Sequence, residues 1–362
     1  MKKIVIFIPS IEYGGVEKNL YQILNYLQRF YSEIYLLTSE EVKLKYLTKK
    51  IKIIFPKYRI WKNSSRLVKS IVCFFLLIKS FKNKRVLLFS FQSNIFSIVA
   101  SKIISSPIII RLNTSPEKYI NNIFKKYLFK FFYSLSDEII VNSYDFKKNI
   151  KKIFNLKSNV ILNPFKLKKI KHKKIIFFKN FNGLKILSIG RLTEQKDHIT
   201  LLKSINLLLK KNKMNVKLYL IGMGYNYDLL SKYIHKNNLK KNIKLAGYKN
   251  NAKDYLKSAD LFILSSKYEG LPNVLLEAQS AGIPIISSNC PTGPREILLN
   301  GKLGNLFKSG DYNDLSKKIL YFKKNKKKYI QKTILAKKYL FRFHYNANLK
   351  KYLIIINKYI KN

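Results

Sequence analysis

The sequence is poor in cysteine, in acidic residues and in long apolar runs. Its 362 residues include only two cysteines, Cys73 and Cys290, which lie far apart and lack the spacing of a disulfide framework or a metal site. Acidic residues number 19 against 71 lysines and arginines, for a net charge of +52. No apolar run approaches the roughly 18 residues that span a membrane, and the strand-like opening up to Ser10 is too short for a signal peptide. We therefore expect a cytoplasmic protein, either soluble or attached to a membrane surface.

The large positive charge indicates an anionic partner. Nucleic acid is the first candidate, but lysines occur in every segment instead of forming one basic stripe, and isoleucine, asparagine, tyrosine and phenylalanine are also abundant. This pattern is typical of a compositional bias over an ordinary fold. An anionic membrane surface is the second candidate, because each well-placed lysine or arginine adds about 1 kcal/mol of attraction. We favour compositional bias with membrane attraction and expect no nucleic-acid partner.

Strand-like apolar runs alternate with helix-length segments along the chain, which predicts parallel sheets covered by helices on both faces. A chain of this length with 47% hydrophobic residues supports two cores. The alternation stops in a basic, irregular stretch after Asn163-Pro164 and then begins again. The predicted parts are a first domain at 1–165, a linker at 166–182, a second domain at 183–343 and a C-terminal helix at 344–362.

Twelve strands are predicted from these runs. Those of the first domain are Ile4–Pro9, Glu33–Thr38, Ile51–Pro56, Val86–Phe91, Ile108–Leu112, Glu138–Asn142 and Val160–Leu162. Those of the second domain are Leu184–Ile189, Val216–Ile221, Ile243–Leu245, Leu261–Ser266 and Ile283–Ser287.

The most informative stretch runs from Glu269 to Glu277 and reads Glu-Gly-Leu-Pro-Asn-Val-Leu-Leu-Glu, between a predicted strand and a predicted helix. Pro272 suits the first helical position, and the backbone N–H groups after it form an anion site at the positive end of the helix dipole. One carboxylate then lies at the end of a strand and the other about one turn inside the helix. Two acceptors for hydroxyls beside a phosphate site suit a nucleotide-sugar; a capped surface helix with incidental glutamates is the alternative.

Further motifs of the second domain follow its other strands, at the edge where such sheets bind ligands. Gly190-Arg191 follows the first of them, and Lys196 comes five residues after Arg191. Both cations can therefore reach a diphosphate, the arginine as a fork and the lysine as a point charge. Gly222 and Gly247-Tyr248 end the next two strands and predict turns of close approach, with Tyr248 beside a base.

In the first domain, Gly14-Gly15 follows the first strand at once and opens a helix over Val16–Leu27. Glycines allow a backbone to approach a ligand closely. A plain tight turn is an equally good interpretation of this pair.

In this order the motifs resemble those of the retaining glycosyltransferases of family 4. That family has the α/β fold called GT-B, with two doubly wound, parallel-sheet, Rossmann-like domains facing a central cleft and a C-terminal helix that crosses back to the first domain. The resemblance covers nearly the whole chain, and the two glutamates with seven residues between them are its most specific feature. The matching motifs are Gly14-Gly15-Val-Glu17, Val141-Asn-Ser143, Asn163-Pro164, Gly190-Arg191, Lys196-Asp197, Gly222, Ala259-Asp260, Glu269-Gly-Leu-Pro-Asn, Glu277-Ala278, Gly282-Ile-Pro284 and Gly293-Pro-Arg-Glu296.

The resemblance implies roles for individual residues. Arg191 and Lys196 would hold the donor diphosphate and, with Glu269, form the catalytic group by stabilising its departure. Glu269 would bind hydroxyls of the donor sugar, and Glu277 would accept hydrogen bonds from the ribose diol. The other donor-binding residues would be Gly14, Gly15, Gly190, Gly222, Tyr248, Gly270, Leu271, Pro272, Asn273 and Val274. The family needs no metal, so we expect neither metal nor cofactor, the nucleotide-sugar being a substrate.

The sequence departs from the family at the end of a middle strand of the first domain. Many relatives carry a histidine there, where this chain has Arg111 and Asn113 on the acceptor side. Asparagine cannot act as a base but can orient a sugar hydroxyl, which leaves the donor phosphate to accept the proton. None of the four histidines is expected to be catalytic.

The Arg111-Leu-Asn113 and Ser288–Leu298 segments are most similar to those of bacterial enzymes that add hexoses or N-acetylhexosamines to lipid-linked glycans. The resemblance implies a UDP-sugar donor and a glycan acceptor carried on polyprenyl diphosphate. It also implies a peripheral position on the inner face of the cytoplasmic membrane, in the synthesis of surface polysaccharide or glycoprotein glycan.

A possible acceptor or membrane surface lies in Tyr119–Leu135, where apolar pairs recur every four residues and Lys125, Lys126 and Lys130 lie off the stripe. The commoner arrangement is a helix that packs this stripe on its own sheet. The alternative is a basic amphipathic helix in a membrane interface, which Trp61, Arg66 and Lys69 could extend.

Other activities fit less well. A phosphorylase needs a pyridoxal-phosphate lysine region that the sequence lacks, and an epimerase shares only the architecture. A retaining glycosidase needs carboxyls about 5–5.5 Å apart and leaves the phosphate-binding loops unexplained. A nucleic-acid-binding protein would carry RNP, KH or zinc-knuckle patterns, and none occurs.

Overall fold

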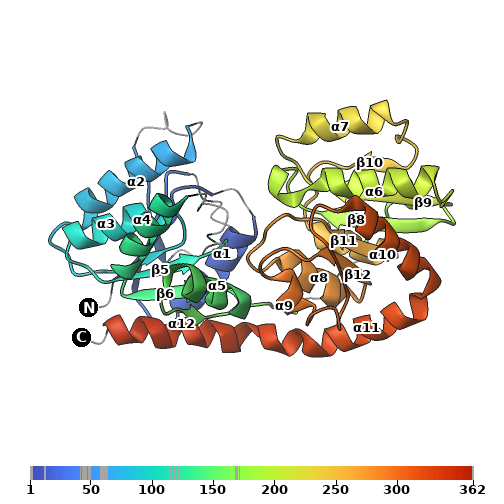
Figure 1. Cartoon of the computed structure of the whole chain (residues 1–362). Helices are drawn as coiled ribbons and strands as arrows, with labels where there is room; N and C mark the ends of the chain where they lie inside the picture. The colour runs from blue at the N-terminus through green and yellow to red at the C-terminus, as the bar shows by residue number, and fades with distance from the viewer. Residues whose placement is uncertain are drawn as a thin grey trace. The chain divides into compact units, whose positions relative to one another are not determined.

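The computed structural model describes residues 3–360 except 12–13, 41, 43–46, 48–49, 58–63, 115, 117–119, 121, 168–169 and 171. The chain forms two compact units, shown in Figure 1: unit 1 contains Met1–Pro164 and Phe343–Asn362, and unit 2 is Phe165–Arg342. Unit 2 therefore lies within the sequence of unit 1. It includes the stretch 166–182 that we expected to be a linker.

In the described part of unit 1, seven strands pair in parallel in the order β3-β2-β1-β4-β5-β6-β7. The order reverses between β1 and β4, and this switch point is where doubly wound sheets bind ligands. The strands are β1 (Lys3–Phe7), β2 (Glu33–Leu37), β3 (Ile51–Ile54), β4 (Leu87–Ser90), β5 (Ile108–Leu112), β6 (Glu138–Val141) and β7 (Asn159–Val160).

Helices cover both faces of this sheet, which explains why its central strands are apolar on both sides. One core joins the sheet to α1 and α12, and the other joins it to α2, α3, α4 and α5. The helices are α1 (Gly15–Leu27), α2 (Arg66–Phe81), α3 (Asn94–Ile103), α4 (Ile123–Ser134), α5 (Tyr144–Phe154) and α12 (Tyr345–Ile360).

The C-terminal helix α12 belongs to the core of unit 1. Leu349 and Ile356 are fully buried among side chains of α1 and the sheet. The Tyr31 hydroxyl donates to Asn357 Oδ1 over 2.6 Å, and the Tyr359 hydroxyl donates to the carbonyl of Asp137 over 3.0 Å. The last element of the chain thus completes the first unit.

Unit 2 repeats the plan, with six described strands paired in parallel in the order β10-β9-β8-β11-β12-β13. Its switch point lies between β8 and β11. The strands are β8 (Leu184–Ile189), β9 (Val216–Ile221), β10 (Ile243–Leu245), β11 (Leu261–Leu264), β12 (Ile285–Ser288) and β13 (Asn305–Phe307). We did not predict β13.

The helices of unit 2 surround this sheet. Side chains of α6 and α10 share its largest core with β8, β9 and β11, while α8 contacts both α9 and α11. The helices are α6 (His198–Lys210), α7 (Tyr227–Lys236), α8 (Asn273–Ala281), α9 (Pro294–Ile297), α10 (Tyr312–Lys324) and α11 (Lys326–Lys338). In the part of the chain that the structure describes, no helix has the length and apolar character needed to cross a membrane.

Candidate active site

Two loops meet at the switch point of unit 2. The first follows β8 and carries Arg191 and Lys196, and the second follows β11 and carries Glu269. Their backbones are joined, since the N–H of Lys267 donates to the carbonyl of Gln195 over 2.8 Å. The Gln195 side chain adds a bond from Nε2 to the carbonyl of Tyr268 over 3.0 Å. These bonds bring together Lys196 and Glu269, which are 73 residues apart in sequence.

Lys196 and Glu269 form an ion pair between these loops. The Lys196 Nζ lies 2.5 Å from Glu269 Oε1, and the two side chains are only 15% and 7% exposed. The Ser266 hydroxyl donates to the same carboxylate oxygen over 2.6 Å. A charge pair so enclosed is weakly screened by water and salt, and it leaves Glu269 Oε2 to accept from a ligand hydroxyl. Arg191 lies at the exposed rim of the first loop.

Hydroxyl side chains that the sequence analysis did not single out hold the two loops in place. Besides Ser266, Ser265 Oγ donates to the carbonyl of Lys196 over 2.8 Å, and Ser288 Oγ donates to the carbonyl of Ser266 over 2.6 Å. The Thr292 hydroxyl donates to the carbonyl of Glu269. All four side chains are buried. The only sequence signal for them is that serine pairs end two apolar strand-like runs. We predicted that Ser265 and Ser266 belong to the strand, but β11 ends at Leu264.

Helix α8 begins directly after this loop and spans Asn273–Ala281, as the helical run in the sequence indicates. Pro272 is the residue before the helix, with ψ 106°, and Asn273 is the first helical residue, so the prediction of Pro272 at the first helical position is wrong. The carbonyl of Pro272 already accepts from the N–H of Leu275 over 3.0 Å. The first backbone N–H groups of α8, from Asn273 and Val274, lie at its positive end, where anions bind. Gly270, Leu271 and Pro272 are buried before it.

Glu277 is half-buried on α8, at its fifth residue. The helix ends as predicted at Gly282, whose φ of +70° is the left-handed conformation that favours glycine at a helix end. The two glutamates therefore lie on either side of the helix start, one on the loop before it and one about one turn inside it.

Close backbone contact explains two glycines of the site. A Cβ on Gly222 would stand 1.8 Å from the carbonyl oxygen of Gly190, so the turns after β8 and β9 can touch only because Gly222 has none. A Cβ on Gly293, which has a φ of +86°, would stand 2.0 Å from the carbonyl oxygen of Gly270. Gly222 also donates its N–H to the carbonyl of Gly247 over 3.0 Å. Tyr248, next in the chain, is 62% exposed and so has room to stack on a flat group.

His198 lies under the first loop as the first residue of α6. It is 4% exposed, and its Nδ1 has no hydrogen-bond partner. Burial, reinforced by the nearby charge of Lys196, lowers the pKa of His198 to about 3. The imidazole is therefore neutral at physiological pH, and its structural role stays a prediction.

The predicted residues of unit 1 lie at the carboxyl edge of its own sheet. Gly14 precedes α1 and Gly15 opens it, while the N–H of Gly14 donates to Glu17 Oε2 over 2.8 Å. Neither glycine has a positive φ. The pair thus places the N-terminus of α1 after β1, beside the switch point of this sheet.

Arg111 is almost fully enclosed, at 1% exposure. Its guanidinium donates to the Tyr352 hydroxyl and to Asn163 Oδ1, each over 2.9 Å, and to Asn113 Oδ1. Asn113 Nδ2 in turn donates to the carbonyl of Phe91 over 2.6 Å. We therefore expect Arg111 to orient Asn113 and to join β5 to α12, while only the half-buried Asn113 remains in reach of an acceptor.

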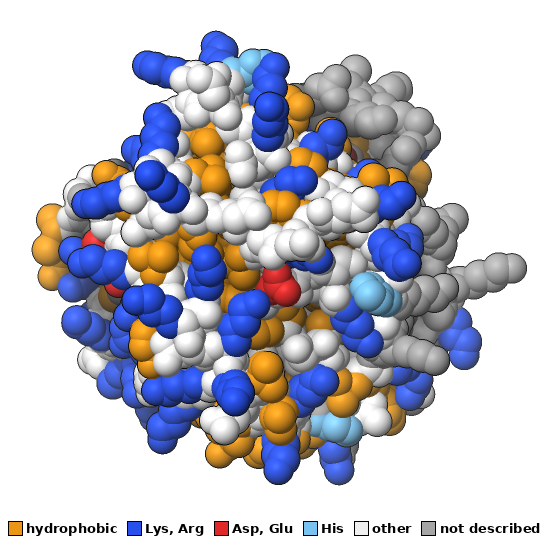
Figure 2. Space-filling model, turned by 90° about the vertical axis from the view of Figure 1, so that its right-hand side faces the viewer, with side chains coloured by type: hydrophobic (Ala, Val, Ile, Leu, Met, Phe, Trp, Pro, Cys, Tyr) orange, Lys and Arg blue, Asp and Glu red, His pale blue; other side chains and the backbone are white. Residues whose placement is uncertain are grey.

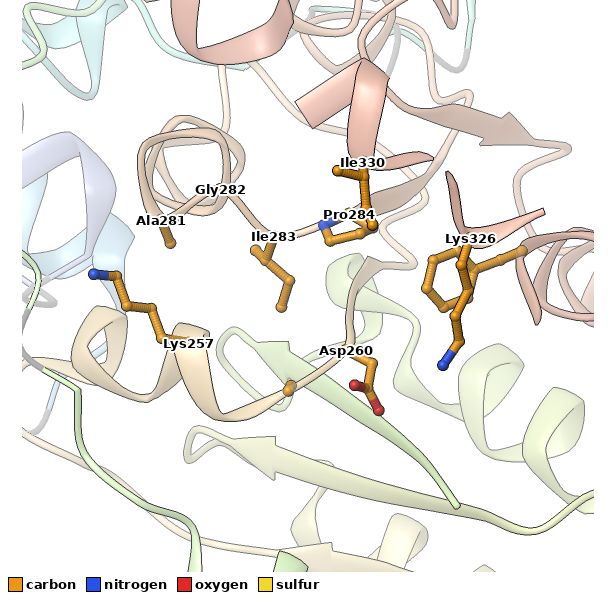
Figure 3. A pocket seen from close by; sticks show the side chains of 10 residues that line it. Lys257, Asp260, Ala281, Gly282, Ile283, Pro284, Lys326 and Ile330 are labelled. Atoms are coloured by element: carbon orange, nitrogen blue, oxygen red, sulfur yellow. The ribbon is translucent and has the colours of Figure 1, made fainter. Parts of the chain in front are cut away.

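A hollow of about 280 Å³ in unit 2 lies on the opposite edge of the sheet from these loops, before β11 and β12 (Figure 3). Its floor is apolar, and its charged lining residues are Lys257, Asp260 and Lys326. The Asp260 carboxylate is engaged by the N–H of Lys185 over 2.8 Å. This hollow therefore lies apart from the loops that carry Lys196 and Glu269.

Basic side chains are spread over the surface. Figure 2 shows a face on which Lys and Arg alternate with apolar and polar side chains and form no continuous stripe. On this face the basic side chains therefore do not form the continuous basic stripe that is typical of a nucleic-acid-binding surface. Among the described residues, no cluster of three or more His, Cys, Asp or Glu side chains could ligate a metal ion.

Comparison with known proteins assigns the second unit to a family. Residues 169–338 match the family described as glycosyl transferases group 1. These residues form a group 1 glycosyltransferase domain. The match covers the two loops, both glutamates and the glycine turns of unit 2.

Individual relatives are similar to about half of the chain. An uncharacterised glycosyltransferase of Methanocaldococcus jannaschii is 35% identical over 201 residues, covering 51% of this chain and 48% of that protein. The N-acetylgalactosamine-N,N'-diacetylbacillosaminyl-diphospho-undecaprenol 4-alpha-N-acetylgalactosaminyltransferase of Campylobacter jejuni is 27% identical over 198 residues, covering 54% and 53%. The chain thus spans about half the length of these curated relatives.

Solved structures match beyond the group 1 domain. HepE of Anabaena, in complex with UDP-glucose, superposes with a TM-score of 0.80 at 17% identity, covering 98% of this chain and 99% of that one. TarM of Staphylococcus aureus superposes with a TM-score of 0.75 at 16% identity, covering 99% of both. With the two parallel-sheet units described above, these likenesses confirm the predicted GT-B fold.

Proposed function

We propose that the protein is a retaining glycosyltransferase that moves a hexose or N-acetylhexosamine from a UDP-sugar to a glycan acceptor carried on polyprenyl diphosphate. The observation that carries the proposal is the Lys196–Glu269 pair at the switch point of unit 2, between Arg191 and the N-terminus of α8. Two cations and a helix N-terminus suit a diphosphate, and a buried carboxylate beside them suits the hydroxyls of the attached sugar.

The donor would lie across the loops of unit 2. Arg191, Lys196 and the N–H groups at the start of α8 stabilise the negative charge that grows on the departing diphosphate, without a metal ion. Glu269 accepts hydrogen bonds from the sugar, held in orientation by Ser266. Glu277 accepts from the ribose diol, and Tyr248 stacks near the base.

The chemical step exchanges one glycosidic bond for another. The bond between the anomeric carbon and the diphosphate oxygen breaks as the acceptor hydroxyl attacks from the same face, which preserves the configuration. The hydroxyl proton passes to the leaving diphosphate oxygen. The neutral, buried His198 takes no part, and Asn113 of unit 1 orients the acceptor.

The choice of substrates rests on relatives. The Anabaena structure holds UDP-glucose, and relatives by name include an Escherichia coli galactosyltransferase that acts on a diphosphoundecaprenol-linked sugar. Others take part by name in amylovoran, capsular polysaccharide and lipopolysaccharide core synthesis. A lipid-linked acceptor places the protein at the inner face of the cytoplasmic membrane as a peripheral protein, in bacterial surface glycan synthesis.

Thermal shift with UDP, GDP and their sugars tests the donor site. We expect UDP to raise the melting temperature and Glu277→Ala to weaken its binding by about tenfold, the loss of one charged hydrogen-bond acceptor. Lys196→Ala should lower kcat by about 10²–10³, as expected when one group that stabilises the leaving charge is removed.

The matched control is Lys210→Ala, which removes the same charge from the exposed end of α6. If Lys196→Ala transfers sugar at the unaltered rate, the proposed role of Lys196 in catalysis is contradicted. If the protein binds GDP more tightly than UDP, the proposed donor is contradicted.

A further inference from the structure

Helix α4 of unit 1 turns an apolar face to solvent. Five large side chains are exposed: Ile123 (68%), Phe124 (71%), Tyr127 (60%), Leu128 (38%) and Phe131 (58%). They belong to the apolar pairs of Tyr119–Leu135, of which Tyr119 lies outside the described residues. The more common arrangement that we weighed, with this stripe packed on the sheet, is therefore wrong.

The same helix packs on unit 1 through a different face. Phe129 and Tyr133 point inward, where the Tyr133 ring lies 5.6 Å from that of Phe154. At 3.6 residues per turn, the five exposed side chains span an arc of about 140° opposite those two. Lys125 borders this arc on one side, and Lys126 and Lys130 border it on the other. An apolar arc with lysines on both sides is the pattern of a helix lying in a membrane interface.

Helix α2 adds a second exposed ridge over the same face of the sheet. Leu67 (60%), Ile71 (39%) and Phe75 (64%) recur every fourth residue and are followed by the exposed Lys79. Helix α3 contacts both α2 and α4, and all three helices pack on one core (Figure 1). Lys69, which we expected to extend this surface, is instead 9% exposed and paired with Glu40 over 2.5 Å. Trp61 lies outside the described residues.

The charge of this surface indicates which kind of partner binds it. The sequences of α2, α3 and α4 contain no aspartate or glutamate, while Arg66, Lys79, Lys102, Lys125 and Lys130 are exposed on them. A second copy of this surface would repel it. Protein surfaces in general offer mixed charge, whereas an anionic bilayer offers negative headgroups above an apolar layer. Lysine stems can lie along that layer with their charges among the headgroups.

We propose that unit 1 docks on an anionic lipid bilayer through the outward faces of α4 and α2, a surface defined by Ile123, Phe124, Tyr127, Leu128 and Phe131 with Leu67, Ile71 and Phe75. This deepens the proposed function and rests on it for the acceptor, because a polyprenyl-linked glycan is met only at a bilayer. Docking itself depends on no catalytic residue.

Vesicle flotation tests the surface. The full-length protein should float with phosphatidylcholine vesicles that contain about 30% phosphatidylglycerol at about 0.15 M salt, and stay behind with phosphatidylcholine alone. Phe124→Ser with Phe131→Ser, and separately Lys125, Lys126 and Lys130→Gln, should each lower the bound fraction at least about tenfold.

Matched controls remove the same groups from unit 2. Tyr227→Ser with Leu229→Ser changes two exposed apolar side chains of α7, and Lys210, Lys211 and Lys213→Gln removes three charges at the end of α6. Both should float as the unaltered protein does. Equal losses in the α4 and α6 lysine variants would show attraction by net charge alone and overturn the surface. The proposed surface would also be overturned if the unaltered protein did not float. The same holds if the protein were a dimer in solution and the two serine substitutions on α4 dissociated that dimer.

Activity distinguishes this proposal from the proposed function. The two serine substitutions on α4 should leave transfer to a short, lipid-free glycan unchanged and lower transfer to a vesicle-borne acceptor. If the unaltered protein transfers sugar to neither acceptor but floats, the enzyme assignment fails and the docking surface stands. If the unaltered protein transfers sugar to both acceptors but does not float, the docking surface fails and the enzyme assignment stands.

Discussion

Ser266 decides how Glu269 is presented. Its buried hydroxyl donates to the same carboxylate oxygen that Lys196 approaches, so the carboxylate is held from two directions. A carboxylate with one fixed oxygen can offer the other to a sugar hydroxyl in a single orientation. In the proposed donor site, specificity for the sugar would therefore depend on a residue that need not touch the sugar.

Removing this hydroxyl should loosen Glu269 without unfolding the loop. We expect Ser266→Ala to lower kcat/KM for the donor about tenfold, the effect of one hydrogen bond to a charged group, measured by steady-state transfer. Ser266→Thr, which restores the hydroxyl, should recover part of the activity. Ser287→Ala, a buried serine whose hydroxyl bonds only to the neighbouring Ser288 carbonyl, is the control. Unchanged kinetics in Ser266→Ala would remove its positioning role.

His198 links the stability of unit 2 to pH. Burial lowers its pKa to about 3 in the folded protein, below the value of about 6.5 for an exposed histidine. The unfolded chain therefore takes up a proton between these values that the folded chain refuses, and stability falls as the pH falls through this window.

The variant His198→Gln lacks this proton uptake. We expect it to be less stable than the unaltered protein at pH 7, and the difference to shrink by about 1 kcal/mol per pH unit between pH 6.5 and 5. Urea unfolding at several pH values measures it. A difference that stays constant with pH would mean that the pKa of His198 is the same in the folded and the unfolded protein.

Among the elements, α12 shows how a helix from the far end of the chain supports unit 1. Ile356 is fully buried against the core of that unit. Ile356→Ala should lower the free energy of unfolding by about 2–5 kcal/mol, the cost of such a cavity. Leu353→Ala, at a partly buried position on the same helix, should cost less. Equal costs would show that α12 is not packed as described.

The sequence predicted several strands well, because short runs rich in apolar residues stand between helix-length segments. The predicted bounds of β5, β8, β9 and β10 are those observed. The sequence also predicted that Lys196 and Glu269 lie at one edge of one sheet, because the carboxyl ends of parallel strands share an edge. The orientation of α4 could not be predicted from the sequence. Apolar residues occur on both sides of this helix, so their periodicity does not show which side is buried. The hydroxyls of Ser265, Ser288 and Thr292 left no pattern, because their partners are backbone carbonyls 22 to 69 residues away in sequence. The bond from Ser266 to Glu269, three residues away, depends on the conformation of the loop between them.

At the scale of the whole molecule, each unit has a sheet, a switch point and a core of its own. The two switch points carry different chemistry. That of unit 2 gathers cations, a carboxylate and a helix N-terminus, while that of unit 1 has a glycine turn and the enclosed Arg111–Asn113 pair. Unit 1 alone bears the exposed apolar and basic face of α2 and α4. The division suits a protein whose donor comes from solution and whose acceptor stays in a membrane.

The insertion of unit 2 within the sequence of unit 1 also orders events during synthesis. The segment Phe165–Arg342 is synthesised before α12, and it contains all the strands and helices of its own core. Unit 2 can therefore fold while unit 1 still lacks the helix that covers α1 and one face of its sheet. Until α12 arrives, the apolar surface that will receive Leu349 and Ile356 stays open to water, and this interval is when nascent chains would be most prone to aggregate or to recruit a chaperone.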